Sequence, residues 1–141
     1  MRCVLDTSVI VSALRSSQGA SYLLLRMVAA GQLRILASPA LFLEYEEVLS
    51  RPEHRLVHGL SVVQVDRLLT DLAVAVEPVE VRFQWRPQVA DPNDDMVFEV
   101  AVNGRADALV THNVRHFVHA ATRFGLTVLT PGEAFRKVKN E

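Results

Sequence analysis

Short apolar runs alternate with amphipathic segments along this chain, and this alternation restricts its fold more than any other feature. Apolar runs that suit strands occur at residues 2–5, 33–37, 108–111 and 128–129. Strands separated by helices form a parallel sheet with helices on both faces, joined by right-handed crossovers. The pattern therefore predicts a three-layer α/β/α fold around a central parallel sheet of four to five strands.

Helix-boundary signals divide the chain between these runs. Capping hydroxyls, prolines and glycines delimit helical segments at residues 20–30, 39–51, 61–75 and 96–103. Thr7 and Ser8 also suit a helix start. Apolar and polar residues alternate from Val79 to Trp85, which favours a strand or an extended connector. Pro131 suits the start of a last helix, and we expect Arg136 to Glu141 to form a frayed, charged tail.

Length and composition set outer limits. The chain has 141 residues, half of them apolar, which suits a single domain spanning residues 1–141. Cys3 is the only cysteine, so it cannot pair within the chain, which fits a reducing compartment. No run approaches the roughly 20 apolar residues of a membrane-spanning helix. We therefore expect a soluble, cytoplasmic protein. A net charge of −1 leaves phosphate binding to local arginines such as Arg15, Arg51 and Arg115.

In parallel α/β sheets, ligands bind beyond the carboxyl ends of the strands. Asp6 directly follows the first apolar run, and Thr111 to Asn113 ends a later one, so both stretches should lie at this edge. Asp6 alone has two interpretations, because an aspartate here can cap the following helix or serve a site. The positions of the other acids are needed to distinguish these two interpretations.

A second group of acids lies in the helix after Pro39. Its apolar stripe consists of Leu41, Tyr45 and Val48. Glu44 and Glu46 fall on opposite borders of this stripe, whereas Glu47 points away from it. Periodicity therefore leaves Glu44 and Glu46 as alternatives, and either one can also be a solvated flank.

Asp94 and Asp95 stand together at a helix start, where the helix dipole stabilises negative charge. With Asp91 before them, Asp94 and Asp95 place more negative charge here than a helix cap requires. A bound cation would offset the repulsion between these carboxylates. Mg²⁺ and Mn²⁺ select carboxylate and water ligands and leave positions open for phosphate oxygens and an attacking water. The acids thus indicate a divalent-metal site suited to phosphodiester hydrolysis.

The chain resembles the PIN-domain family, and in particular the VapC-like toxin ribonucleases of bacterial toxin-antitoxin systems. The resemblance rests on the order and spacing of four segments: VLDTSV at residues 4–9, EYEEVL at 44–49, DPNDDMVFEVA at 91–101 and ALVTHNVRHF at 108–117. It implies that Asp6, Glu44 and Asp95 are acids of the family's site, with Asp94 as the close alternative to Asp95 as a metal ligand.

The resemblance also implies roles for residues near the last strand end. Ser8 and Thr111 match positions that line the site. Apart from the resemblance, either His112 or His116 is expected to contact an RNA phosphate, and Arg115 is a further candidate for RNA contact. Asn113 stands where the family usually has a fourth acid. An asparagine oxygen can still ligate a metal or hold its water, but one negative charge is lost.

These features lead to a metal-dependent endoribonuclease that uses Mg²⁺ or Mn²⁺, and to the toxin of a pair neutralised by a small antitoxin. A homodimer is compatible with the sequence. The alternative is a catalytically degenerate PIN-like domain that binds RNA or protein, which Asn113 keeps open. A phosphoacceptor or phosphatase domain is disfavoured because the residue two beyond Asp6 is Ser8 and not a second aspartate.

Overall fold

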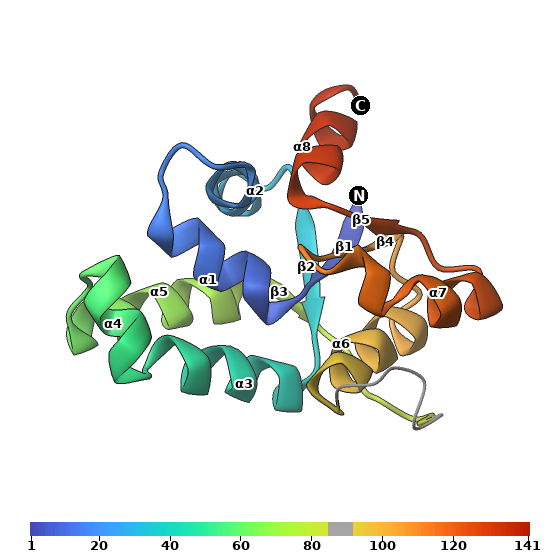
Figure 1. The fold of residues 1–141 in the computed structure, drawn as a ribbon, viewed down its shortest axis with the longest axis horizontal. Coiled ribbons are helices and arrows are strands. Elements are labelled where there is room, and N and C mark those ends of the chain that lie inside the picture. The colour runs from blue at the N-terminus through green and yellow to red at the C-terminus, as the bar shows by residue number, and fades with distance from the viewer. Residues whose placement is uncertain (85–91) are drawn as a thin grey trace.

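The computed structural model describes residues 1–84 and 92–141 and contains a five-stranded, fully parallel sheet (Figure 1). The strands run in the order β3-β2-β1-β4-β5. Their bounds are β1 (Arg2–Leu5), β2 (Arg34–Ala37), β3 (Val76–Pro78), β4 (Ala108–Val110) and β5 (Val128–Leu129). The prediction of a parallel sheet flanked by helices is confirmed.

The helices divide between the two faces of the sheet. One side carries α1 (Thr7–Arg15), α2 (Ala20–Ala29), α3 (Pro39–Leu49), α4 (Pro52–His58) and α5 (Val62–Ala75), and the other carries α6 (Pro92–Asn103) and α7 (Val118–Phe124) (Figure 1). A short 3-10 turn, η1 (Val114–His116), links β4 to α7, and α8 (Pro131–Lys139) packs on α2. The chain runs from β1 through β2 to β3 and then returns past β1 to β4 and β5. Because the crossovers are right-handed, the helices of the outward path cover one face of the sheet and the helices of the return path cover the other.

For residues 79–85, of which 79–84 are described, the strand alternative is wrong and the connector alternative stands. The strand lies earlier, over Val76–Pro78, where Ile35 pairs with Val76. Residues 79–84 carry no regular secondary structure, and Trp85 lies outside the described residues, as does Asp91. The Asn103 side chain instead accepts hydrogen bonds from the backbone of Arg82 and Phe83, at 3.0 Å each. Val79 N still donates to Ala37 O of β2 at 3.0 Å, and beyond it the Asn103 side chain holds the segment beside α6.

The C-terminal tail is also more ordered than predicted. Helix α8 continues to Lys139, so Arg136 to Lys139 are helical and not frayed. A capping box begins this helix, because the Thr130 hydroxyl accepts from Glu133 N and the Glu133 carboxylate accepts from Thr130 N. These bonds lower the pKa of Glu133, and its negative charge also suits the helix N-terminus.

The core lies between the sheet and the two helical layers. Buried β1 residues, among them Val4 and Leu5, pack with Leu41 of α3 and Phe98 of α6. Cys3 is fully buried, and burial raises the pKa of its thiol to about 12, so the side chain stays protonated. No helix in the described ranges has the length and apolar character needed to span a bilayer.

Gly104 provides a test of packing where α6 ends. A methyl group here would lie 2.7 Å from Leu36 Cδ2 and 2.9 Å from Val79 Cγ2. We expect Gly104→Ala to lower the free energy of unfolding by about 1–3 kcal/mol, as overpacking does. In urea titrations, Gly132→Ala is the control, because its methyl group would meet only Arg136 Nη1, at 3.5 Å. Equal stabilities of the two variants would contradict this account of the core.

Candidate active site

The carboxyl edge of the sheet carries a polar residue after three of its strands: Asp6 after β1, Ser38 after β2 and Thr111 after β4. All three are buried. Asp6 N donates to Val110 O at 2.9 Å, which continues the pairing of β1 with β4 by one step and brings Asp6 beside Thr111. The sequence expectation that these segments meet at one edge is therefore confirmed.

Asp6 does not act as a side-chain cap for α1. Its Oδ2 atom accepts hydrogen bonds from Thr111 Oγ1 at 2.7 Å and from Ser8 Oγ at 3.0 Å. Thr111 is fully buried and its hydroxyl also accepts from Asn113 N at 2.9 Å. The two hydroxyls hold the carboxylate in one orientation, and no described residue donates to Oδ1. That second oxygen suits a ligand role.

Glu44 is tied to the same edge through the residue after Asp6. Thr7 Oγ1 donates to Glu44 Oε2 at 2.9 Å. Next to Glu44 on α3, the buried Tyr45 hydroxyl donates to the carbonyl of Leu5. Burial, with the charge of the nearby Asp6, raises the pKa of Tyr45 well above its usual value, so the phenol remains a donor. Helix α3 is thereby held against the end of β1.

The other two acids of α3 face away from this edge. Glu46 and Glu47 are both exposed, and Glu47 forms an ion pair with Arg51 at 2.8 Å. Of the two alternatives that periodicity left open, only Glu44 contacts the Asp6–Ser8 segment. Arg51, one of the arginines expected to bind phosphate, forms an exposed ion pair with Glu47.

Asp94 and Asp95 are both buried in the first turn of α6. Asp94 Oδ2 lies 3.2 Å from His116 Nδ1, so the acid is linked to η1. Glu99, one turn beyond Asp95, is only 3% exposed. The sequence reading missed this third buried acid, although the spacing of four residues from Asp95 was a usable signal.

The donor set fits a hard divalent ion in its chemistry, because Asp6, Glu44, Asp94 and Asp95 all offer carboxylate oxygens. Within the described ranges, however, no three Asp, Glu, His or Cys side chains converge on one point as a finished metal cluster. Hydroxyl groups contact Asp6 and Glu44, and an imidazole contacts Asp94. An ion at this edge would therefore draw ligands from three elements: the end of β1, α3 and α6.

The three histidines after β4 lie on separate elements. His112 follows β4 and its Nε2 lies 3.2 Å from Ser21 Oγ of α2. His116 ends η1 beside Asp94, and His119 is exposed on α7. Arg115 is also exposed on η1. These positions separate His112, which faces α2, from the other two.

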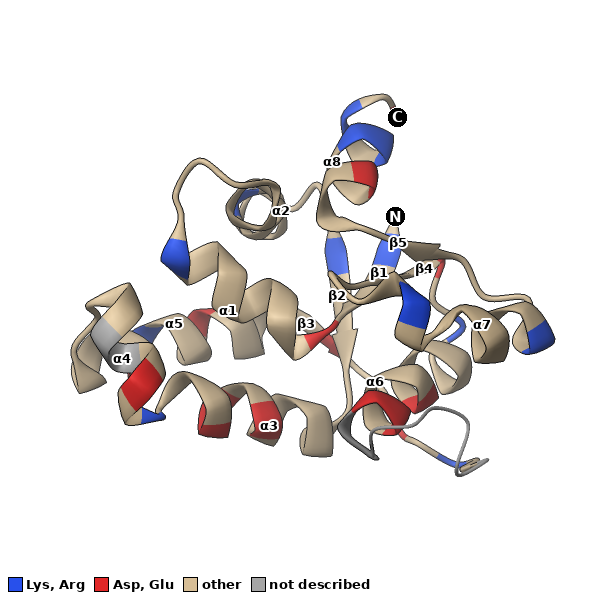
Figure 2. Ribbon diagram, in the orientation of Figure 1, with Lys and Arg blue, Asp and Glu red and all other residues tan. Residues whose placement is uncertain are grey.

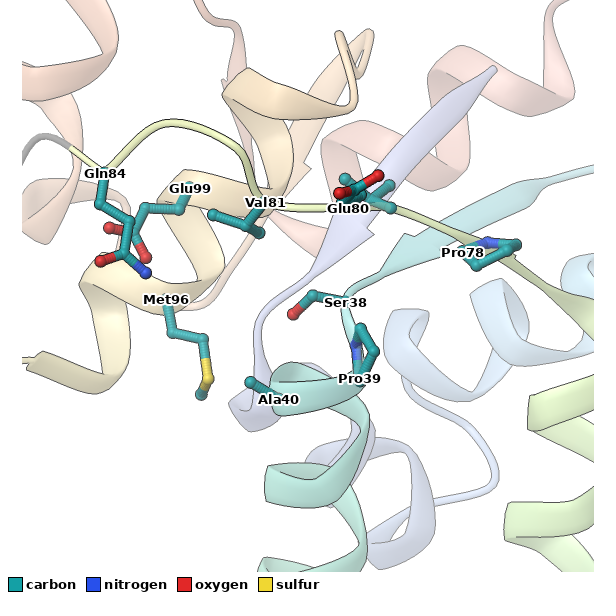
Figure 3. Close-up of a pocket in the computed structure, with 10 residues that line it drawn as sticks. Ser38, Pro39, Ala40, Pro78, Glu80, Val81, Gln84, Met96 and Glu99 are labelled. Carbon is teal, nitrogen blue, oxygen red and sulfur yellow. The ribbon is translucent and has the colours of Figure 1, made fainter.

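Several hollows open at this end of the described part of the chain, and two of them bear on the site. A polar cleft of about 520 Å³ lies between α1 and α3–α4, lined by Thr7, Ser8, Val11, Ser12, Arg15, Val48, His54, His112 and Asn113. A second, more apolar hollow of about 610 Å³ lies beyond β2 and β3, with Ser38, Ala40, Met96 and Glu99 among its lining residues (Figure 3). Figure 2 shows acidic positions on α3 and α6 and at the start of α1 around this end.

Fold and site together define a PIN domain: the PIN-domain family profile matches residues 2–115, and the chain belongs to that family. The fold is also similar to a chain in the crystal structure of VapBC2 from Rickettsia felis bound to a DNA fragment from their promoter, with a TM-score of 0.58. That comparison covers 92% of this chain and 98% of the other at 16% identity, which establishes the fold alone. No curated protein sequence matches the chain.

The Thr111 hydroxyl is open to a direct stability test. Thr111→Val keeps the shape but removes the donor to Asp6, so unfolding should become easier by about 1.5–3 kcal/mol, typical of a bond to a charged group. Thr111→Ser keeps the hydroxyl and loses one methyl group, which costs about 0.8 kcal/mol. Urea denaturation compares the two. A smaller loss in Thr111→Val than in Thr111→Ser would show that the hydroxyl does not support Asp6.

Proposed function

We propose that this PIN domain is a cytoplasmic endoribonuclease that depends on Mg²⁺ or Mn²⁺. The observation that carries the proposal is the buried Asp6 carboxylate, held by Ser8 and Thr111 at a strand end, with the Thr7–Glu44 hydrogen bond alongside it. Family membership supports a nuclease, and the hard oxygen donors support a divalent ion.

In this proposal Asp6, Glu44 and Asp95 hold the ion, and Asp94 is the alternative to Asp95. A bound divalent ion supplies a water of lowered pKa and neutralises charge at the phosphate. The hydroxyls of Ser8 and Thr111 keep Asp6 oriented toward it, and the Thr7 hydroxyl does the same for Glu44. Asn113, on the rim of the cleft, offers its amide oxygen to the ion or to the water.

We further propose that the chain is the toxin of a toxin-antitoxin pair. The support is the similarity of its fold to a chain of the VapBC2 complex, which is a two-component assembly on promoter DNA. By this proposal a small partner protein covers the acidic edge, which is the carboxyl edge of the sheet with Asp6, Glu44, Asp94 and Asp95, and blocks cleavage. Co-expression of this chain with the product of an adjacent short reading frame should restore growth that the chain alone inhibits.

A second candidate function is a PIN domain that binds RNA without cutting it. Asn113 favours it, because this exposed side chain follows Thr111 where an acid would add charge to the site. The two functions differ in turnover. Cleavage of RNA by purified protein in the presence of Mg²⁺ or Mn²⁺, lost on chelation with EDTA, would exclude the binding-only function.

Removal of single site charges tests the catalytic proposal. Asp6→Asn should reduce metal-dependent RNA cleavage at least about 100-fold, because it removes a ligand charge while keeping the shape. Glu44→Gln and Asp95→Asn should each cause a large loss, and their combinations with Asp6→Asn should add little, since residues that act as one unit fail together.

Glu47→Gln is the matched control, because Glu47 is an exposed acid on the same helix as Glu44. It should retain nearly full activity. Melting temperatures of the four single variants, Asp6→Asn, Glu44→Gln, Asp95→Asn and Glu47→Gln, establish that each is folded. Unchanged turnover in Asp6→Asn would place the reaction elsewhere.

Asn113→Asp tests whether this side chain faces the same ion. An added charge should strengthen metal binding, because hard cations gain affinity with charged ligands. Half-maximal cleavage should then need several-fold less Mg²⁺, and Mn²⁺ should raise the melting temperature more than in the wild-type protein. Asn113→Ala should shift both quantities the other way. Identical metal titrations in all three proteins would put Asn113 outside the site.

A further inference from the structure

The polar cleft between α1 and α3–α4 begins at the acidic edge and ends at a basic position. Ser8, Ser12 and Arg15 line it from one face of α1, since their spacings of four and three residues bring them into a row. Ser8 bonds to Asp6 at one end. Arg15 lies in the last turn of α1 at the other end, and Figure 2 shows this basic end of α1 above α4.

Arg15 is paired with an imidazole in the cleft. Its Nη2 atom lies 3.4 Å from Nδ1 of His54, which belongs to α4. A guanidinium has no acceptor, so in this hydrogen bond Arg15 donates and His54 accepts through Nδ1. The neutral imidazole then carries its proton on Nε2, where it can donate to an anion. The pair thus presents one permanent cation and a second donor together.

The lining of the cleft is suited to a phosphate backbone. Its described lining residues include three hydroxyl side chains, two imidazoles, one amide and one guanidinium, and none of them is an acid. A volume of about 520 Å³ lies in the range that holds a drug-sized molecule, which is the size of a nucleotide or two of a single strand. Helix α1 rises about 10 Å from Ser8 to Arg15.

We infer that this cleft is the path of the RNA strand, and that Arg15 with His54 binds a phosphate away from the one that is cut. The inference rests on the proposed function and specifies its substrate contact. At about 3.4 Å per phosphate in a stacked strand, a rise of about 10 Å places this second phosphate within roughly three nucleotides of the reacting one. Arg15 and His54 are positioning residues in this account.

The test separates binding from cleavage. Affinity for a fluorescent single-stranded RNA is measured by anisotropy with Mg²⁺ in the Asp6→Asn background, where the RNA should stay intact. Adding Arg15→Gln should weaken binding roughly tenfold, because a charge-assisted contact is lost. The slope of log affinity against log salt should fall in magnitude by about 0.7, the value for one phosphate contact on a single strand. His54→Gln should weaken binding less.

Arg26→Gln is the matched control. Arg26 is an exposed arginine in the last turn of α2 and does not line the cleft, so the substitution removes the same charge from an equivalent position. It should change neither affinity nor salt slope. A set of RNAs, each with one neutral methylphosphonate linkage at a different position, locates the phosphate contact. At one position, within roughly three linkages of the cut, neutralisation should weaken RNA binding by Asp6→Asn but not by Asp6→Asn/Arg15→Gln.

Equal effects of Arg15→Gln and Arg26→Gln would overturn the cleft assignment whether or not the wild-type protein cuts RNA. The absence of any linkage whose neutralisation weakens RNA binding by Asp6→Asn but not by Asp6→Asn/Arg15→Gln would overturn it in the same way. Absence of metal-dependent cleavage by the wild-type protein, with the Arg15-specific loss of binding intact, would overturn the proposed reaction and leave the cleft assignment standing. Melting temperatures of the arginine variants verify that each is folded.

Discussion

Leu5 pairs with Val110 in parallel register, and Asp6 N donates to Val110 O, so β1 and β4 end at the same level. The chemistry of the edge depends on this pairing. It brings Asp6 and Thr111 together although 105 positions separate them in sequence. Because side chains alternate between the two faces of a strand, a register shift of one residue would move Thr111 to the other face and leave the buried carboxylate without its nearest donor.

Burial of so many acids at one edge is costly, and the structure offsets the cost locally. Asp6, Asp94, Asp95 and Glu99 are all buried. Asp6 accepts two hydroxyl donors, and Asp94 lies against His116. Asp94 and Asp95 also occupy the first turn of α6, where unsatisfied backbone N–H groups favour negative charge. Hydroxyl donors, an imidazole and a helix N-terminus thus support Asp6, Asp94 and Asp95, which fits an edge that keeps its charge for a purpose other than stability.

The sequence predicted those features of the fold that depend on neighbouring residues, and it did not predict those that depend on contacts between residues far apart in the chain. The strand ends and the existence of α6 were predictable because apolar runs and helix-boundary signals are local, although α6 begins at Pro92, before the predicted segment 96–103. Strand β3 was not, because it has only three residues, Val76–Pro78, and its place is set by pairing with β2. Helix α4 was hidden because Arg51-Pro52 reads as a stop, although Pro52 is the first residue of a new helix.

The same distinction applies to the site. Asp6 was found from its position after a strand, but Glu44 and Glu46 could not be separated by periodicity, because both border the apolar stripe of α3. The choice comes from how α3 packs on β1, through Tyr45 and the Leu5 carbonyl. The Thr7–Glu44 and His116–Asp94 contacts likewise join elements 37 and 22 residues apart, so no local pattern could foresee them.

Asp6 lies just before α1 and Arg15 lies in its last turn, and this separation bears on how such a protein could bind an anionic chain. With a net charge of −1, the molecule as a whole does not attract RNA, and the acids at the edge repel it until a cation is present. A single arginine placed among these acids would pair with a carboxylate, which competes with phosphate for the same guanidinium donors. Arg15 avoids this, because its polar partner in the cleft is the imidazole of His54. A cation at the acidic end and Arg15 at the other would make both ends of the cleft attractive to one strand, and a strand held at two points has its intervening phosphates positioned before any reaction begins.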